Sequence, residues 1–137
     1  MPGQDSQKSS WDPEARRRRW AEHEAARFER VMKYCRANFA TARLEDVAEH
    51  VGLSPFHFHR WFSVMAGRTF KTVMTEMQLE HARAMLLGGT PISRVAERCG
   101  FAHQSHFTSR FSMYHGNSPG RWLRAQNGAA AQRRPAA

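Results

Sequence analysis

The stretch VAEHVGLSPFHFHRWF (residues 47–62) decides the fold, because an altered copy, VAERCGFAHQSHFTSRF (residues 95–111), follows about 48 residues later. Each copy has a short helical segment, a glycine and a second segment with phenylalanines four residues apart. At a spacing of 48, and of 49 after one inserted residue, the matches are Val47, Ala48, Glu49 and Gly52 with Val95, Ala96, Glu97 and Gly100, then His57, Phe58, Phe62, Ser63 and Gly67 with His106, Phe107, Phe111, Ser112 and Gly116. A short helix, a glycine turn and an apolar-striped helix form a helix-turn-helix. The sequence therefore predicts two such units in one chain.

Helix boundary signals extend this pattern along the chain. Asp12 with Pro13, and Ser54 with Pro55, are typical of helix starts. We expect helices over residues 13–38, 44–51, 55–65, 69–87, 92–99 and 103–115, with a short one from 119. No stretch alternates as a strand does. The prediction is an all-α fold of about seven helices: a basic, partly helical extension (1–26), a first helix-turn-helix subdomain (27–67), a long linker helix (68–88), a second subdomain (89–126) and a disordered tail (127–137).

The composition favours an anionic partner. The 137 residues carry a formal net charge of +9 at pH 7, and 41% of them are hydrophobic, which is enough for a core. Cys35 and Cys99 stand far apart in apolar contexts, so we expect two core thiols in a reducing, intracellular compartment. No apolar run approaches the roughly 18 residues of a membrane-spanning helix.

The residues do not favour an enzyme or a metal protein. HEAAR (23–27) is one histidine short of the zinc-protease pattern HExxH. His57 and His59 are two residues apart and point to different sides of a helix, and His103 and His106 lack a clear third ligand. We expect no catalytic activity, no cofactor and no metal.

These segments resemble the DNA-binding domain of the AraC/XylS family of bacterial transcription regulators, over residues 27–125. LEDVAEHVGLSPFHFHRWF (44–62) is similar to the first unit, GRTFKTVMTEMQLEHARAMLL (67–87) to the linker helix and PISRVAERCGFAHQSHFTSRFSMYHGNSP (91–119) to the second unit. The resemblance implies a seven-helix domain that places two recognition helices in adjacent major-groove segments of promoter DNA.

The length leaves no room for the effector-binding domain that many members carry. The chain is thus similar to the short, stand-alone members of the family, or to a domain cut from a longer protein. We expect control by protein abundance rather than by a ligand. The expected partners are double-stranded promoter DNA, bound as a monomer, and RNA polymerase, with no membrane and a cytoplasmic location at the nucleoid.

The first recognition helix separates core from candidate reading residues. Its expected core stripe is Phe58, Trp61, Phe62 and Met65, and opposite lie Phe56, Arg60 and Ser63, with His59 on the flank. The family's base-contacting positions match Phe56, His59 and Arg60. An arginine can hydrogen-bond guanine O6 and N7 together, although a solvated surface cation is the alternative for Arg60. We expect Ser54 and Ser63 to contact the DNA backbone.

The second recognition helix is poorer in base-reading side chains. Its expected core stripe is Phe107, Phe111 and Tyr114, its candidate base contacts are Gln104, Ser105, His106 and Ser109, and its candidate backbone contacts are Thr108, Arg110 and Ser112, with Arg121 beyond it. Relatives often carry Arg at position 109, Asp at 103, and arginines at 76 and 78. The Ser109, His103, Glu76 and Gln78 of this chain indicate weaker discrimination by the second unit and fewer of the usual backbone contacts.

The sequence is also compatible with two other functions. The chain can be a helical interaction module that acts on another regulator or on RNA polymerase without reading DNA. It can also bind RNA or duplexes without sequence preference. The arginine run at 16–19 fits either extra phosphate contacts or a solvated helix face.

Overall fold

The computed structural model describes residues 11–133, with no account of the side chains of 131–133. Within that range the chain forms seven helices and no strand: α2 (Pro13–Ala37), α3 (Leu44–His50), α4 (Pro55–Ala66), α5 (Phe70–Leu87), α6 (Ile92–Arg98), α7 (Gln104–His115) and α8 (Pro119–Arg133). The predicted all-α fold is confirmed. The predictions for residues 1–10 and 134–137 lie outside the described part.

Side-chain caps fix where several helices begin. Asp12 Oδ1 accepts the backbone N–H of Glu14 at 3.0 Å, and Pro13 opens α2. The Ser54 hydroxyl oxygen accepts the backbone N–H of His57 at 3.2 Å at the start of α4. These caps satisfy donors that a helix leaves free in its first turn. Both predicted starts are confirmed.

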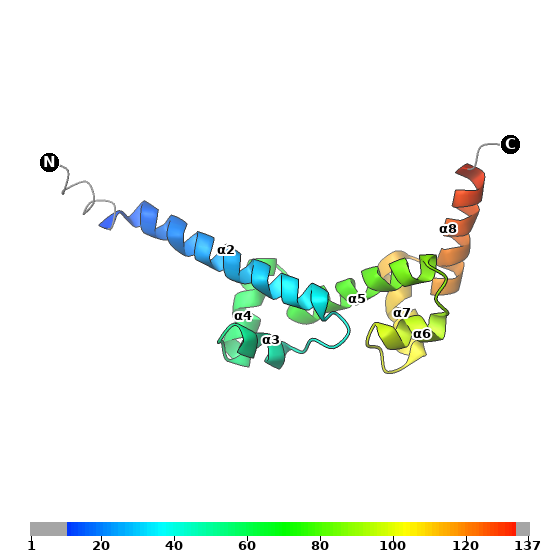
Figure 1. Cartoon of the computed structure of the whole chain (residues 1–137), viewed down its shortest axis with the longest axis horizontal. Coiled ribbons are helices and arrows are strands. Elements are labelled where there is room, and N and C mark those ends of the chain that lie inside the picture. The colour runs from blue at the N-terminus through cyan, green and yellow to red at the C-terminus, as the bar shows by residue number, and fades with distance from the viewer. Residues whose placement is uncertain (1–10, 134–137) are drawn as a thin grey trace.

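The molecule has two hydrophobic cores, and α5 contributes to both. The first core consists of Val31, Cys35, Val47, Ala48, Phe58, Phe62, Phe70, Val73 and Met74. The second consists of Leu79, Ala82, Leu86, Val95, Ala96, Cys99, Phe107, Phe111 and Trp122. One half of α5 therefore packs in each unit, and Figure 1 shows this helix running between them. Cys35 and Cys99 are fully buried, as expected of core thiols.

The helix α2 is anchored to the first unit by a buried polar contact. Glu24 is 7% exposed, and the indole N–H of Trp61 on α4 donates to its carboxylate. The guanidinium of Arg27 lies 3.8 Å from the same carboxylate and 5.8 Å from the Trp61 ring centroid. The packing of α2 thus begins at Glu24, three residues before the predicted start of the subdomain. The preceding turns of α2 extend beyond the unit (Figure 1).

Two details of the second unit differ from the sequence prediction. Tyr114, expected in the core stripe, is 43% exposed. His115 takes the inner place instead, because its ring packs against Phe111 and Trp122 and its Nε2 lies 3.2 Å from the Leu79 carbonyl oxygen. The last helix also continues to Arg133 through residues assigned to the tail, where successive alanines favour helix.

Candidate nucleic-acid interface

The two helix-turn-helix turns have the same backbone geometry. Gly52 and Gly100 have φ of 73° and 90°, a conformation that costs a side chain strain but suits glycine. The next residue donates its N–H back across each turn, from Leu53 to the Ala48 carbonyl at 2.9 Å and from Phe101 to the Ala96 carbonyl at 3.0 Å. The repeated sequence therefore gives α4 and α7 equivalent positions in their units.

The outer face of α4 presents an aromatic ring and a guanidinium together. Phe56 is 65% exposed, and the Arg60 guanidinium carbon lies 5.7 Å from its ring centroid. Phe58 and Phe62 are fully buried on the other side of the helix. Arg60 is exposed and belongs to none of the ion pairs among the described residues. His59 is exposed beside it.

Two exposed apolar residues on the same faces were missed by the sequence analysis. Val64 on α4 is 82% exposed and lies four residues after Arg60, hence on the same side of the helix. Met113 holds the equivalent place on α7 at the spacing of 49, and it is 76% exposed. The register of the repeat, applied to residues that do not match, could have found both.

The outer face of α7 carries shorter polar side chains. The candidate residues Gln104, Ser105, His106 and Ser109 are all exposed. Arg110 donates from Nε to His106 Nε2 at 3.4 Å, which ties two neighbouring candidates to each other. His103 at the start of the helix forms no side-chain cap, unlike Ser54 in the first unit. The second reading face thus has neither a free arginine among its candidate base contacts nor a capped start.

Two of the predicted backbone contacts are poorly placed to donate to a phosphate. The Ser63 hydroxyl is covered and has no hydrogen-bond partner among the described residues. The Ser112 hydroxyl donates to the Thr108 carbonyl oxygen at 2.7 Å, so its proton is already used within α7. The other predicted backbone contacts are disposed as follows: Ser54 is exposed but serves as a helix cap, Thr108 is half-buried, and Arg110 and Arg121 are exposed.

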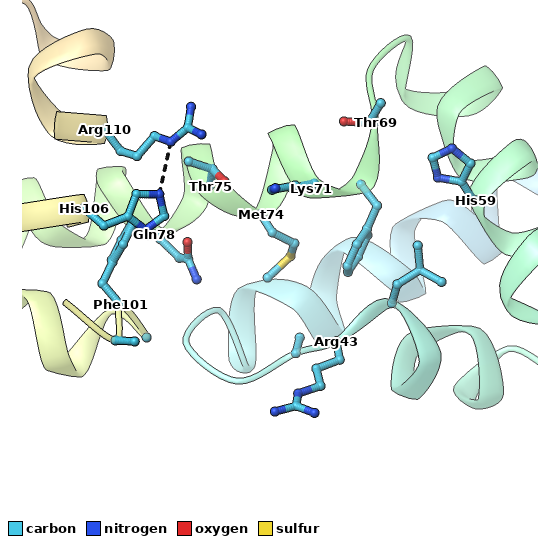
Figure 2. A pocket seen from close by; sticks show the side chains of 15 residues that line it. Arg43, His59, Thr69, Lys71, Met74, Thr75, Gln78, Phe101, His106 and Arg110 are labelled. Atoms are coloured by element: carbon cyan, nitrogen blue, oxygen red, sulfur yellow. Dashed lines mark hydrogen bonds between the residues drawn. The ribbon is translucent and has the colours of Figure 1, made fainter.

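A hollow separates the two reading helices. It has a volume of about 660 Å³ and opens between α4 and α7 over α5, as Figure 2 shows. His59 lines it from α4, and His106 and Arg110 line it from α7. Gln78 lies on its α5 wall, and the neighbouring Glu76 forms an ion pair with Arg68. Three predicted DNA-contacting residues therefore border one cavity.

Other candidates stand apart from these faces. The arginines at 16–19 are exposed on the part of α2 that extends beyond the first unit (Figure 1). No group of three or more potential metal ligands occurs among residues 11–133. No helix in the described part is long and apolar enough to cross a membrane.

Known proteins are similar to this chain over the two helix-turn-helix units. A family model described as a helix-turn-helix domain matches residues 47–125. The regulatory protein PocR of Salmonella typhimurium is 31% identical over 88 residues, 63% of this chain and 29% of PocR. The melibiose operon regulatory protein of Escherichia coli is 36% identical over 77 residues, 56% of this chain and 26% of that protein. The chain thus spans less than a third of the length of these relatives.

A solved structure gives the same match in three dimensions. A transcriptional regulator from Chromobacterium violaceum, described as containing an AraC-type DNA-binding domain, superposes with a TM-score of 0.68 and 25% identity. The match covers 77% of this chain and 95% of that one.

Proposed function

Because the chain belongs to the AraC family of helix-turn-helix proteins, we propose that it is a sequence-specific transcription regulator that inserts α4 and α7 into adjacent major-groove segments of promoter DNA. The observation that carries this proposal is the exposed Phe56–Arg60 pair on α4, opposite the buried face of that helix. The equivalent place of α7 in the second unit supports a second contact by the same chain. The net charge of +9 supports attraction to the phosphate backbone.

The two reading faces differ, which favours unequal half-sites. Arg60 offers two parallel donors to a guanine, whereas the equivalent Ser109 offers one short hydroxyl. We expect the box contacted by α4 to be strongly constrained and the box contacted by α7 to be degenerate. Base contacts are assigned to Phe56, His59 and Arg60 on α4, and to Gln104, Ser105, His106 and Ser109 on α7. Arg110 and Arg121 are assigned to the backbone.

The experiment is selection of bound duplexes from a random library at about 150 mM salt, where nonspecific binding is weakened. Two enriched boxes about 10 base pairs apart would support the proposal and give the operator sequence. One enriched box would mean that a single unit reads bases. No enrichment would overturn the proposal in favour of an interaction module that does not read DNA.

One chain carries both reading helices, which supports binding as a monomer. The test is the mass of the complex with a duplex that holds both boxes, measured by sedimentation at concentrations near the Kd. One chain per duplex is expected, and two chains per duplex would contradict monomeric binding.

As a regulator at the bacterial nucleoid, the protein is proposed to act through contact with RNA polymerase.

A further inference from the structure

The hollow between the two units has an apolar floor. Phe70 and Met74 on α5 form part of it, and they are also members of the first core. Leu44 and Phe101, both half-buried, line it from the start of α3 and the turn between α6 and α7. Covering such a surface with an apolar group removes it from water, which lowers the free energy. A volume of about 660 Å³ lies within the range typical of small-molecule sites.

The sides of the hollow carry positive charge without negative charge. Arg43, Lys71 and Arg110 line it, and all three are exposed. None of them takes part in an ion pair among residues 11–133. The residues that line the hollow include no aspartate or glutamate. Glu76 lines a smaller neighbouring hollow, which Lys71 and Arg110 also border. The field in the larger hollow therefore favours an anion.

The basic groups stand over the apolar floor. In Figure 2, Lys71 and Arg110 lie along α5, and the Met74 side chain extends from α5 toward the loop that carries Arg43. Arg110 donates from Nε to His106, and its terminal nitrogens make no hydrogen bond to another described residue. A carboxylate in the hollow can accept hydrogen bonds from the basic groups that line it, while a hydrocarbon or aromatic body lies on the apolar floor.

We propose that this hollow binds a small organic carboxylate with an apolar body. An inorganic phosphate would use the basic groups and leave the floor wet, so the apolar floor selects the amphipathic ligand. Since His59, His106 and Arg110 also face the hollow, the bound carboxylate and DNA exclude each other. This second statement rests on the proposed function, whereas the binding itself does not. Control by a ligand would replace the control by abundance expected from the sequence.

The test measures binding without DNA, by calorimetry of the full chain with decanoate. Saturable binding of one decanoate per chain is expected, with no binding of decyltrimethylammonium, which has the same tail and the opposite charge. Lys71→Gln should weaken decanoate binding about tenfold, the order expected for one charge-assisted hydrogen bond. Lys33→Gln, an exposed lysine on α2 outside the hollow, is the matched control and should change the affinity less than twofold.

A second variant tests the place of the ligand without removing charge. Ala102 is exposed and lines the hollow, so Ala102→Trp fills the space and should abolish saturable binding. Circular dichroism and thermal melting of each variant establish that the fold is intact. Three results would overturn the proposal: no saturable binding of decanoate, equal binding of inorganic phosphate at the same concentration, or equal losses in Lys71→Gln and Lys33→Gln.

A last arm separates this site from the proposed function. Decanoate at saturation should raise the Kd for the selected operator at least tenfold. If decanoate binds and the Kd is unchanged, mutual exclusion is wrong and the site stands. If decanoate binds but no operator was enriched, the proposed function fails and the site stands.

Discussion

At the scale of single residues, Arg60 is the side chain on which selectivity depends most. Its guanidinium is exposed and lies over the Phe56 ring, which limits the conformations it must give up on binding. Arg60→Ala should therefore cost about 1–3 kcal/mol on the operator and relax preference at one position of the first box. The measurement is titration of operators altered one base at a time. Equal losses on every duplex would make Arg60 a phosphate contact.

Val64 provides a residue-scale test that changes the DNA rather than the protein. Its methyl groups are exposed on the face that carries Phe56 and Arg60, where a thymine methyl is the apolar partner available in the major groove. Replacing one thymine of the first box by deoxyuridine removes that methyl and should weaken binding about three- to fourfold, the value of one buried methyl group. In Val64→Ala the sensitive position should lose its response. An unchanged response in the variant would assign the methyl contact to Phe56.

The two cysteines test how well the cores exclude solvent. Burial raises the pKa of the Cys35 and Cys99 thiols to about 11, above the roughly 8.5 of a free cysteine, so both stay protonated at neutral pH. Only the thiolate reacts with iodoacetamide, and its fraction at pH 7.5 falls more than about 100-fold with this shift. We expect the native chain to remain unmodified while the urea-unfolded chain gains two labels, measured by intact mass. Comparable rates in the two states would contradict the buried placement.

At the scale of the helices, the anchoring of α2 depends on one buried carboxylate. Trp61→Phe keeps an aromatic ring but removes the N–H that donates to Glu24, so it should lower the free energy of unfolding by about 1–3 kcal/mol. Glu24→Gln should cost less, because an amide is cheaper to bury than a carboxylate. Urea unfolding followed by circular dichroism gives both values. The double variant should lose less than the sum, and strict additivity would mean that the two side chains act independently.

The helices were predictable because their signals are local. The cap at Asp12, the Ser54–Pro55 start and the two turn glycines act over a few residues, and the phenylalanine spacing identifies the inner faces of α4 and α7. Which of Tyr114 and His115 is buried could not be predicted from the neighbouring residues. Both lie on the inner side of α7 by spacing, and contacts with Trp122 and Leu79, from α8 and α5, decide which one is buried.

The candidate site likewise has features that the sequence predicts and features that it does not. The exposure of Phe56 and Arg60 follows from the periodicity of one helix, and the structure agrees. The contact of Glu24 with Trp61 joins residues 37 positions apart, and no pattern in the sequence marks it. The hollow likewise depends on how two units sit on α5, so its lining residues come from five separate segments of the chain.

At the scale of the whole molecule, the two units touch through more than α5. Phe39, in the loop after α2, packs against the second core. Its ring stacks on the His81 ring of α5, with the ring centroids 3.7 Å apart. The Ala40 carbonyl in the same loop lies so close to Gly100 that a side chain there would overlap it. The loop after α2 therefore contacts both the second core and the turn between α6 and α7.

Gly100 is therefore more tightly packed than its counterpart Gly52. Both glycines have positive φ, so alanine at either costs about 1–2 kcal/mol of backbone strain. A Cβ on Gly52 meets nothing within 4 Å, whereas a Cβ on Gly100 must displace the Ala40 backbone. Gly100→Ala should therefore destabilise the fold more than Gly52→Ala, measured by urea unfolding of the two variants.

The same pair of variants tests whether this contact sets the spacing of the readers on DNA. If the second unit is pushed away from the loop, α7 no longer meets its box when α4 occupies the first. Gly100→Ala should then bind a duplex with both boxes no better than a duplex with the first box alone, while its affinity for the first box is retained. Gly52→Ala should keep the advantage of the second box, because its strain stays within the first unit. The comparison is four titrations, two variants against two duplexes, at a temperature where both variants are folded. If the second box helps both variants equally, the spacing is fixed by α5 alone and the contact between Gly100 and Ala40 serves only stability.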